Sequence, residues 1–309
     1  MAALMTNLRE TVSLDEAARR RWDVLVVGAG PAGALAARQL AKGGASVLLV
    51  DQARFPRFKV CGGCLNASAL ASLTACGLGD VPQQCDAPTL QRLLLGCGRS
   101  VATLALPAGA ALSRTALDAA LVREAIRAGA AFLPECTVRL GACDTNGRQC
   151  TLRRRADAAR VHARVVVAAS GVGGPLLNNE PPFSLHVRPD ARIGAGAVLQ
   201  GADDGYAIGS IYMACDRGGY VGLTRIEDNR LNVAAALDPQ CVRQAGDVGA
   251  AIRSILEASP FPTPVGLDSA RWRGTPPLTC RRRPVAAERV FLIGDATGYV
   301  EPFTGEGMA

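Results

Sequence analysis

Short apolar runs alternate with polar, glycine-containing segments along most of this chain. Residues 23–27 and 46–50 are two such runs, and an alanine- and leucine-rich stretch over residues 34–42 lies between them. Apolar runs of about four to eight residues are typical of strands buried in a parallel sheet, whereas helices need longer stretches. The pattern therefore predicts a strand, a helix ended by Gly43 and Gly44, and a second strand.

The rest of the chain is expected to be rich in strands. Asn146-Gly147 is a strong hairpin signal between two of them. Helices are expected at residues 111–129 and 247–258. Strands are expected at residues 90–95, 101–106, 132–140, 149–154, 161–169, 193–200, 206–214, 220–226, 231–237 and 289–293, of which the four between 193 and 237 are expected to be antiparallel.

The loop after the first strand carries three glycines at nucleotide-binding spacing, Gly28, Gly30 and Gly33. In this position the first glycine allows a tight turn, the second leaves room for a pyrophosphate, and the third allows close helix–strand packing. The helix N-terminus adds N–H donors and partial positive charge. Asp51 closes the second strand, about twenty residues on, where a carboxylate is expected to bind an adenosine ribose. This context predicts a dinucleotide site.

A second glycine-containing motif follows the apolar strand at residues 289–293. Gly294-Asp295 places a carboxylate at the end of that strand, where it can accept hydrogen bonds from a sugar-like hydroxyl chain. The later Gly305 and Gly307 allow the backbone to approach a flat ligand closely. Alone, this segment is an ordinary strand-to-helix turn, so its functional meaning depends on the N-terminal motif.

Together the two motifs resemble those of a flavoprotein family that contains geranylgeranyl reductases, aromatic-ring hydroxylases and flavin-dependent halogenases. In that family the N-terminal motif binds the ADP half of FAD, the Gly-Asp motif binds the ribityl chain, and the following Pro-x-x-Gly-x-Gly segment passes the isoalloxazine ring. The resemblance spans residues 22–309. It implies FAD-binding roles for Gly28, Gly30, Ala32, Gly33, Asp51, Gly294, Asp295, Pro302, Gly305, Gly307 and Met308.

Three further segments extend the resemblance. Residues 55–63 resemble the reductase-type connection from the second strand to the flavin, which implies cofactor contacts for Arg57, Lys59, Cys61 and Gly62. Arg114 stands where the family has an arginine that contacts the cofactor from the start of a helix. Val138 stands where the family has a residue that touches the adenine ring.

The fold class implied is α/β, with a Rossmann-like FAD-binding domain of the glutathione-reductase type and an inserted antiparallel β-sheet substrate domain. The FAD-binding domain is expected over residues 22–85, 111–175 and 285–309, and the substrate domain over residues 86–110 and 176–284. Residues 1–21 are interpreted as a charged leader or short helix. Because the chain stops at Ala309, inside the expected cofactor motif, we expect a C-terminal truncation.

Departures from the family pattern limit the expected chemistry. Ser170-Gly171 stands where the hydroxylases carry Asp-Gly, which weakens a hydroxylase assignment. Trp22 and Trp272 cannot supply the Trp-x-Trp-x-Ile-Pro motif of the halogenases. The Tyr-x-Trp-x-Phe-Pro segment of the reductases is only faintly matched at residues 212–216. The cysteine-glycine segment nevertheless favours the reductase branch.

The 11 cysteines are odd in number and lack the spacing of a disulfide framework. Cys61 and Cys64 form a C-x-x-C pair with three interpretations: a redox dithiol facing the flavin, half of a zinc site, or a loop in which Cys64 is a small buried apolar side chain. No second pair follows at ligand spacing, and the only histidines are His162 and His186, so no metal is expected. We favour the third interpretation.

Composition narrows the partners. Aromatic residues make up only 4% of the chain, which argues against base-stacking surfaces for nucleic acid. The net charge of +7 is densest at residues 153–155 and 281–283; we interpret these arginines as solvated, with a phosphate or anionic-membrane patch as the alternative. No stretch reaches the roughly twenty apolar residues of a membrane span. Residues 1–21 lack the apolar core of a signal peptide, so a cytoplasmic location is expected.

The expected function is that of an FAD-dependent oxidoreductase. NADH or NADPH is the expected transient reductant, and the alkene of a small apolar, isoprenoid or polyketide-like substrate is the expected acceptor. No catalytic side chain is assigned. Tyr206, Tyr212 and Tyr220 are candidate proton donors, although tyrosine on a strand is more often a packing residue. The alternatives are a flavin-dependent monooxygenase and a non-catalytic FAD-binding redox-partner protein.

Overall fold

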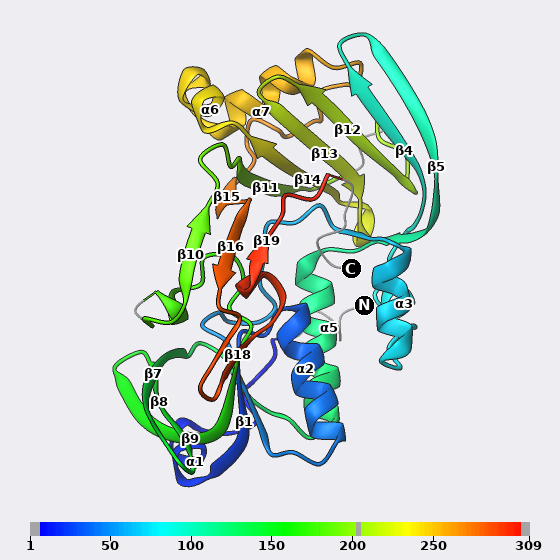
Figure 1. The fold of residues 1–309 in the computed structure, drawn as a ribbon. Helices are drawn as coiled ribbons and strands as arrows, with labels where there is room; N and C mark the ends of the chain where they lie inside the picture. The colour runs from blue at the N-terminus through cyan, green and yellow to red at the C-terminus, as the bar shows by residue number, and fades with distance from the viewer. Residues whose placement is uncertain (1–6, 179, 202–204, 304–309) are drawn as a thin grey trace. The chain divides into compact units, whose positions relative to one another are not determined.

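A computed structural model describes residues 7–178, 180–201 and 205–303. The chain divides into two compact units, each built from three segments (Figure 1). Unit 1 comprises Met1–Arg57, Thr115–His186 and Cys280–Tyr299, and unit 2 comprises Phe58–Arg114, Val187–Thr279 and Val300–Ala309. The functional domain boundaries given above stay predictions.

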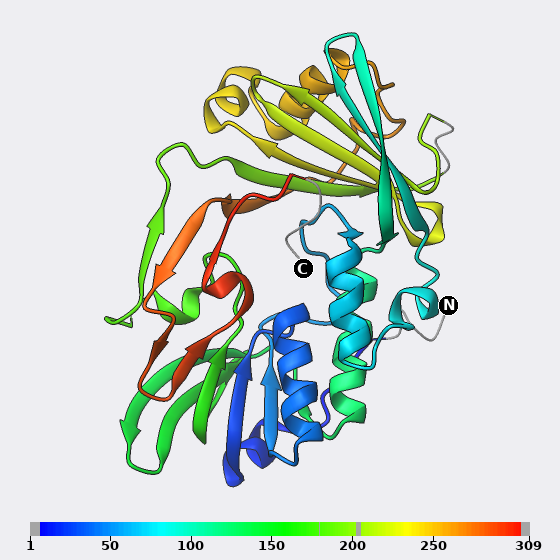
Figure 2. The ribbon, with the colours of Figure 1, turned by 45° about the vertical axis from the view of Figure 1, so that its right-hand side comes forward.

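A parallel sheet lies at the centre of unit 1. It runs from β18 (Val290–Leu292) through β9 (Asp157–Ala168), β1 (Arg21–Val27) and β2 (Val47–Val50) to β6 (Ala131–Leu133). Helices α2 (Pro31–Lys42) and α5 (Arg114–Arg127) lie side by side next to it (Figures 1 and 2). All four residues of β2 are buried, as expected for a parallel strand covered on both faces. The strand–helix–strand unit expected from the sequence is confirmed.

Smaller elements complete unit 1. The antiparallel strands β7 (Thr137–Asp144) and β8 (Gly147–Arg154) extend the sheet from β9, and β17 (Ala286–Ala287) pairs with β18. A second sheet contains β10 (Ser184–Val187), β16 (Cys280–Arg283) and β19 (Gly298–Tyr299). The prediction of a single strand at residues 132–140 is wrong. It divides into β6 and β7 because Pro134 has no N–H donor and Glu135 adopts a φ of +57°.

The N-terminal segment packs into the core of unit 1. Helix α1 (Leu14–Arg19) begins with a capping box between Ser13 and Glu16, which confirms the short-helix interpretation for this stretch. Val12 and Ala17 belong to the same buried cluster as the sheet, and Trp22 Nε1 donates a hydrogen bond of 3.0 Å to the Ala17 carbonyl. Apolar burial therefore ties this segment to the sheet.

Unit 2 contains an eight-stranded, mostly antiparallel sheet. Its order is β15 (Arg273–Pro277), β11 (Ile193–Leu199), β14 (Leu231–Leu237), β13 (Gly219–Arg225), β12 (Ser210–Asp216), β4 (Thr89–Cys97), β5 (Ser100–Ala111) and β3 (Cys64–Leu65), with β12 and β4 parallel. Helices α6 (Pro239–Ala245) and α7 (Val248–Glu257) lie on one face (Figure 2), and α3 (Ala67–Ala75) and α4 (Val81–Gln84) precede β4. The β4–β5 hairpin and the four antiparallel strands are confirmed. However, β12 starts at Ser210 and not at residue 206, because Gly209 turns the chain with a φ of +79°.

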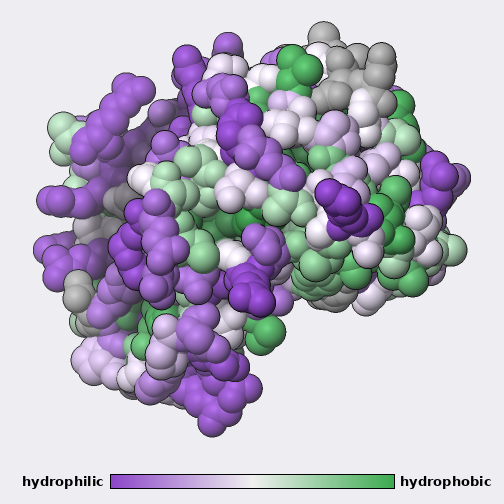
Figure 3. Space-filling view, turned by 90° about the horizontal axis from the view of Figure 1, so that it is seen from above, coloured by the Kyte–Doolittle hydropathy of each residue, from purple (hydrophilic) through white to green (hydrophobic). Residues whose placement is uncertain are grey.

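The surface of the described residues is mixed in character. On the face shown in Figure 3, hydrophilic side chains surround and separate the apolar patches. Within the part of the chain that the structure describes, no helix is long and apolar enough to cross a membrane.

Two glycines allow the start of α2 to approach the sheet. Gly28 has a φ of +107°, and a Cβ on this residue would lie 2.2 Å from the carbonyl oxygen of Ala169, which follows β9. A Cβ on Gly33 would lie 1.8 Å from the carbonyl oxygen of Gly28. Both obstacles are backbone atoms, which cannot rotate away as a side chain can. The helix can therefore occupy this position only if both residues lack a side chain.

Gly33→Ala should destabilise the protein by about 1–3 kcal/mol, because the new methyl group forces α2 away from the loop. Gly43→Ala is the matched control at the other end of α2, since its Cβ would meet the carbonyl oxygens of Leu40 and Gln39 only at ordinary contact distances of 3.4 and 3.5 Å. It should change stability by less than about 0.5 kcal/mol. Chemical denaturation followed by circular dichroism measures both. Equal stability of the two variants would contradict this account.

Candidate functional site

The start of α2 offers backbone donors to a ligand. Gly30 is the N-cap residue with an extended backbone, no side chain caps the helix there, and Pro31 occupies the first helical position. The N–H groups of a first helical turn have no partner within the helix. Together with the positive end of the helix dipole, they form the kind of site that binds a pyrophosphate.

The second glycine motif meets the first at this helix. Gly294 follows β18, has a φ of +57°, and begins the 3₁₀ turn η3 (Gly294–Ala296). A Cβ on Gly294 would lie 2.7 Å from the Cβ of Ala32, so the two motifs pack against each other only because this residue is a glycine. The half-buried Asp295 comes next in the turn. The fold thus brings together the two segments to which the sequence assigned the ADP and ribityl parts of FAD.

Asp51 lies at the end of β2 and is 7% exposed. Its Oδ2 accepts a hydrogen bond of 2.8 Å from the backbone N–H of Ala29, in the glycine-rich loop, and its Oδ1 accepts one of 2.8 Å from Ala53. Each carboxylate oxygen has a second lone pair, so these bonds leave acceptor capacity for a ribose hydroxyl. Asp51 therefore orders the glycine-rich loop and is also suited to the predicted ribose contact.

Arg57 lies between two carboxylates in unit 1. Its guanidinium is 3.7 Å from Asp51 and 3.1 Å from Asp118, and it stands over the Phe55 ring at 4.9 Å from the centroid. Asp118 is fully buried, and a buried carboxylate requires such a partner. Sequence reasoning missed Asp118, although it comes four residues after Arg114 on the same predicted helix.

The segment after Arg57 continues in unit 2 along its sheet. Lys59 and Gly62 are exposed, and the Cys61 carbonyl accepts a hydrogen bond of 2.9 Å from Asn232 Nδ2 on β14. A Cβ on Gly196 of β11 would lie 3.1 Å from the Val60 side chain. These contacts hold the segment over the sheet face opposite α7.

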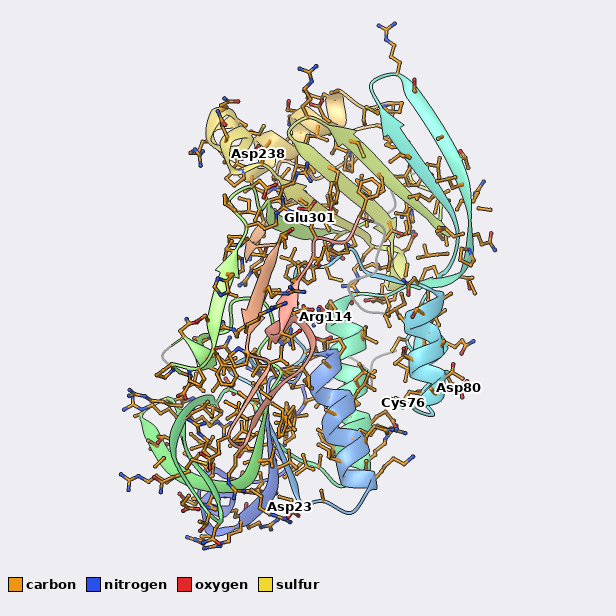
Figure 4. All side chains as sticks on the ribbon, in the orientation of Figure 1. Asp23, Cys76, Asp80, Arg114, Asp238 and Glu301 are labelled. Atoms are coloured by element: carbon orange, nitrogen blue, oxygen red, sulfur yellow. The ribbon has the colours of Figure 1, made fainter. Side chains whose placement is uncertain are left out.

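The other predicted site residues lie in several places. Arg114 is the first residue of α5 (Figure 4), and Val138 is a half-buried residue of β7 that packs against the unit 1 core. The Pro302 carbonyl accepts a hydrogen bond of 2.9 Å from Tyr220 Oη on β13. Their cofactor contacts stay predictions. Gly305, Gly307 and Met308 lie outside the described residues.

The segment around Pro302 makes two further contacts within unit 2. Glu301, the residue before Pro302 (Figure 4), forms an ion pair with Arg192 at 2.9 Å. The Phe303 ring packs edge-on against Tyr220 with centroids 5.0 Å apart. Unit 2 thus fixes the start of the segment that the resemblance places along the isoalloxazine ring.

Cys61 and Cys64 each contact the backbone of their own loop. Cys61 Sγ accepts a bond of 3.4 Å from the Gly63 N–H, and Cys64 Sγ donates one of 3.4 Å to the Gly62 carbonyl. Cys64 is buried within an apolar cluster that includes Leu90. No cysteine of the described chain is in a disulfide, and no metal-ligating cluster occurs among the described residues. The geometry agrees with a loop whose thiols are packing groups.

Comparison with known proteins identifies the family. The model of the FAD-binding domain family matches residues 21–309. The chain belongs to this FAD-binding family. FAD is therefore the cofactor, and the protein is an FAD-dependent oxidoreductase with a mixed α/β FAD-binding fold.

Two relatives in this family match almost the whole chain. A menaquinone reductase of Mycobacterium tuberculosis is 29% identical over 322 residues, covering 96% of this chain and 74% of the relative. Digeranylgeranylglycerophospholipid reductase 1 of Methanothermobacter thermautotrophicus is 27% identical over 300 residues, covering 93% of this chain and 73% of the relative.

Two solved structures have a similar fold. A myxobacterial chondrochloren halogenase has a TM-score of 0.80 at 19% identity, covering 94% of this chain and 71% of that one. A probable FAD-dependent monooxygenase from Pseudomonas aeruginosa has a TM-score of 0.73 at 20% identity, covering 94% and 82% of the two chains. At this level of identity the likeness shows the fold alone.

Asp295→Ala should weaken FAD binding by about 1.5–3 kcal/mol, because a charge-assisted hydrogen bond to the ribityl chain is lost. The wild-type protein should release FAD and not FMN. Folding should survive, since β18 is held by apolar burial. Asp157→Ala, at the exposed start of β9, is the control. Flavin titration of the apoproteins measures the effect, and equal affinity of Asp295→Ala and wild type would show that the Gly-Asp assignment is wrong.

Cys64→Ser should retain most NAD(P)H-dependent turnover, because a packing thiol takes part in no chemical step. A hydroxyl in place of a buried thiol costs some stability only. Cys97→Ser, which changes an exposed thiol, serves as the control. A folded, flavin-loaded Cys64→Ser protein without activity would instead indicate a dithiol relay with Cys61.

Proposed function

We propose that this protein is an FAD-dependent reductase that uses NAD(P)H to reduce an alkene of an apolar, isoprenoid or polyketide-like substrate. Bound FAD supplies the hydride-transfer chemistry, and the protein supplies binding, orientation and exclusion of water. Two observations support this function: the named roles of the relatives, and the face of the unit 2 sheet opposite α7.

The observation that carries the proposal is that two relatives, each aligned with more than nine-tenths of this chain, are named as reductases. Their named substrates, menaquinone and digeranylgeranylglycerophospholipid, carry polyprenyl chains with alkene groups. The halogenase and monooxygenase structures are 20% identical or less, so they support the shared fold without favouring either chemistry.

The unit 2 sheet supports an apolar substrate. One face of β11, β14 and β13 packs against α7 with Ala195, Val233 and Leu223, and alternate residues must point to the opposite face. On that face these strands carry the small residues Gly194, Gly196, Gly222, Ala234 and Ala236, beside the larger Val198 and Tyr220. A Cβ on Gly196 would meet the Val60 side chain at 3.1 Å, so the segment that contains Cys61 already covers part of this face. We propose that the substrate lies over the remaining part, beside that segment.

The geometry separates the three candidate proton donors. Tyr206 lies before β12, is buried, and donates its hydroxyl to the Pro262 carbonyl. Tyr212 belongs to the α7 side of the sheet, where its oxygen accepts a bond of 3.0 Å from the Ala207 N–H. Only Tyr220, of these three, stands on the small-residue face, half-buried. It is our candidate donor, because a phenol at this position can deliver a proton to a substrate above the sheet.

The proposal is tested by the products of the reaction. The FAD-loaded protein is incubated without oxygen with NADPH or NADH and with a detergent-dispersed polyprenyl lipid, either menaquinone or a digeranylgeranyl lipid. After air has oxidised any quinol back to the quinone, mass spectrometry should still show the gain of two hydrogens for each alkene reduced, with matching oxidation of the nicotinamide. Asp295→Ala, depleted of FAD, is the inactive control, and Asp157→Ala is the active one.

Two other outcomes would replace the proposal. A product that gains an oxygen atom, formed only in air, would identify a monooxygenase. Absence of nicotinamide oxidation with either lipid, in a protein that retains FAD, would favour the non-catalytic redox-partner alternative.

A further inference from the structure

The hairpin formed by β13, the 3₁₀ turn η2 (Glu227–Asn229) and β14 carries two buried polar side chains. Glu227 and Asn232 are each 5% exposed. A buried carboxylate or amide is costly unless it is hydrogen-bonded. Both have partners far away in the sequence, and each partner belongs to a segment with a predicted cofactor role.

Glu227 binds the residue before Arg114. Its Oε2 accepts a bond of 2.9 Å from the Ser113 N–H, and its Oε1 accepts one of 2.5 Å from the Ser113 hydroxyl. Arg230 pairs with the same carboxylate at 2.5 Å and balances its charge. A negative charge is favourable here, because Ser113 immediately precedes α5 and its positive dipole end. Glu227 thus holds the residue that precedes Arg114 in place.

Asn232 binds the other segment. Its amide donates to the Cys61 carbonyl, as described above, and it lies against Gly63, where a Cβ would stand 3.5 Å from Asn232 Nδ2. The Gly63 carbonyl in turn accepts a bond of 2.7 Å from the Leu112 N–H. The two segments are therefore bonded to the same hairpin and to each other.

We propose that Glu227 and Asn232 are positioning residues for FAD binding. They hold Arg114 and the loop of Cys61 and Gly62 in one fixed arrangement and do not themselves touch the cofactor. The inference rests on the proposed cofactor roles of Arg114, Cys61 and Gly62. Both side chains are rigid because each is buried, and three hydrogen bonds converge on the Glu227 carboxylate.

The test compares FAD affinity and its coupling to Arg114. Glu227→Ala and Asn232→Ala should each weaken FAD binding to the full-length apoprotein about tenfold, measured by flavin fluorescence titration. Asn232→Asp keeps the shape of the side chain but cannot donate to a carbonyl, so it should weaken binding as much as Asn232→Ala. Glu227→Gln keeps an acceptor for the Ser113 N–H and should restore most of the affinity. Asp228→Asn, in the same turn, is the control and should bind FAD like wild type.

Coupling separates positioning from a general loss of stability. In an Arg114→Ala background, Glu227→Ala should cause little further loss of affinity, because the group that it positions is gone. Ser113→Ala, which removes only the hydroxyl partner, provides a milder version of the same cycle if Glu227→Ala does not fold. Thermal unfolding of each apoprotein records any stability change separately.

The outcomes distinguish the role of Arg114 in FAD binding from the positioning role of Glu227 and Asn232. If Arg114→Ala leaves FAD affinity unchanged, the proposed role of Arg114 is wrong, and the inference falls with it. If Arg114→Ala weakens binding but Glu227→Ala does not, or if the two losses simply add, the role of Arg114 stands and the positioning inference is overturned. Wild-type affinity of Asn232→Asp would overturn it for Asn232.

Discussion

The backbone contact between the start of α2 and the loops at the ends of β1 and β9 is the constraint on which the cofactor site depends. A side chain on Gly28 or Gly33 would overlap a carbonyl oxygen, so these positions allow the helix to point its positive end at the carboxyl edge of the sheet. Gly294 then fits against Ala32 for the same steric reason. The two predicted cofactor motifs therefore meet where side chains are absent.

The buried carboxylates near this packing each have a hydrogen-bonding or charged partner. Asp51 accepts a hydrogen bond from the Ala29 N–H in the glycine-rich loop, and the fully buried Asp118 holds the guanidinium of Arg57 close to it. Removing one partner of such a pair leaves an uncompensated buried charge, which costs more than the pair contributes. The same reasoning applies to Glu227 in unit 2, where Arg230 supplies the balancing charge. In both units, buried ionic groups order the segments that carry predicted cofactor residues.

Sequence reasoning succeeded where structure follows from local pattern. The β1–α2–β2 unit and the β4–β5 hairpin follow from apolar runs separated by glycine, and these signals span only a few residues. It failed where one residue interrupts an apolar run, as Pro134 and Gly209 do. The pairs Glu227–Ser113 and Asn232–Cys61 join residues more than a hundred positions apart. No local signal marks such partners, because a buried Glu and an exposed one look alike in sequence.

The glycine motifs are assigned to FAD binding, and FAD serves both reduction and oxygenation, so these motifs cannot decide between the two chemistries. What differs between such enzymes must lie in the residues that surround the substrate. The candidate residues in this chain lie on one face of the unit 2 sheet, where β11 and β14 carry Gly194, Gly196, Ala234 and Ala236 opposite the side that packs against α7. Tyr220 stands on the second side, with its hydroxyl bonded to the carbonyl of Pro302. Arg192 stands over the Tyr220 ring at 5.9 Å from its centroid and pairs with Glu301, so a charged pair lies beside the phenol that we propose as the proton donor to the alkene.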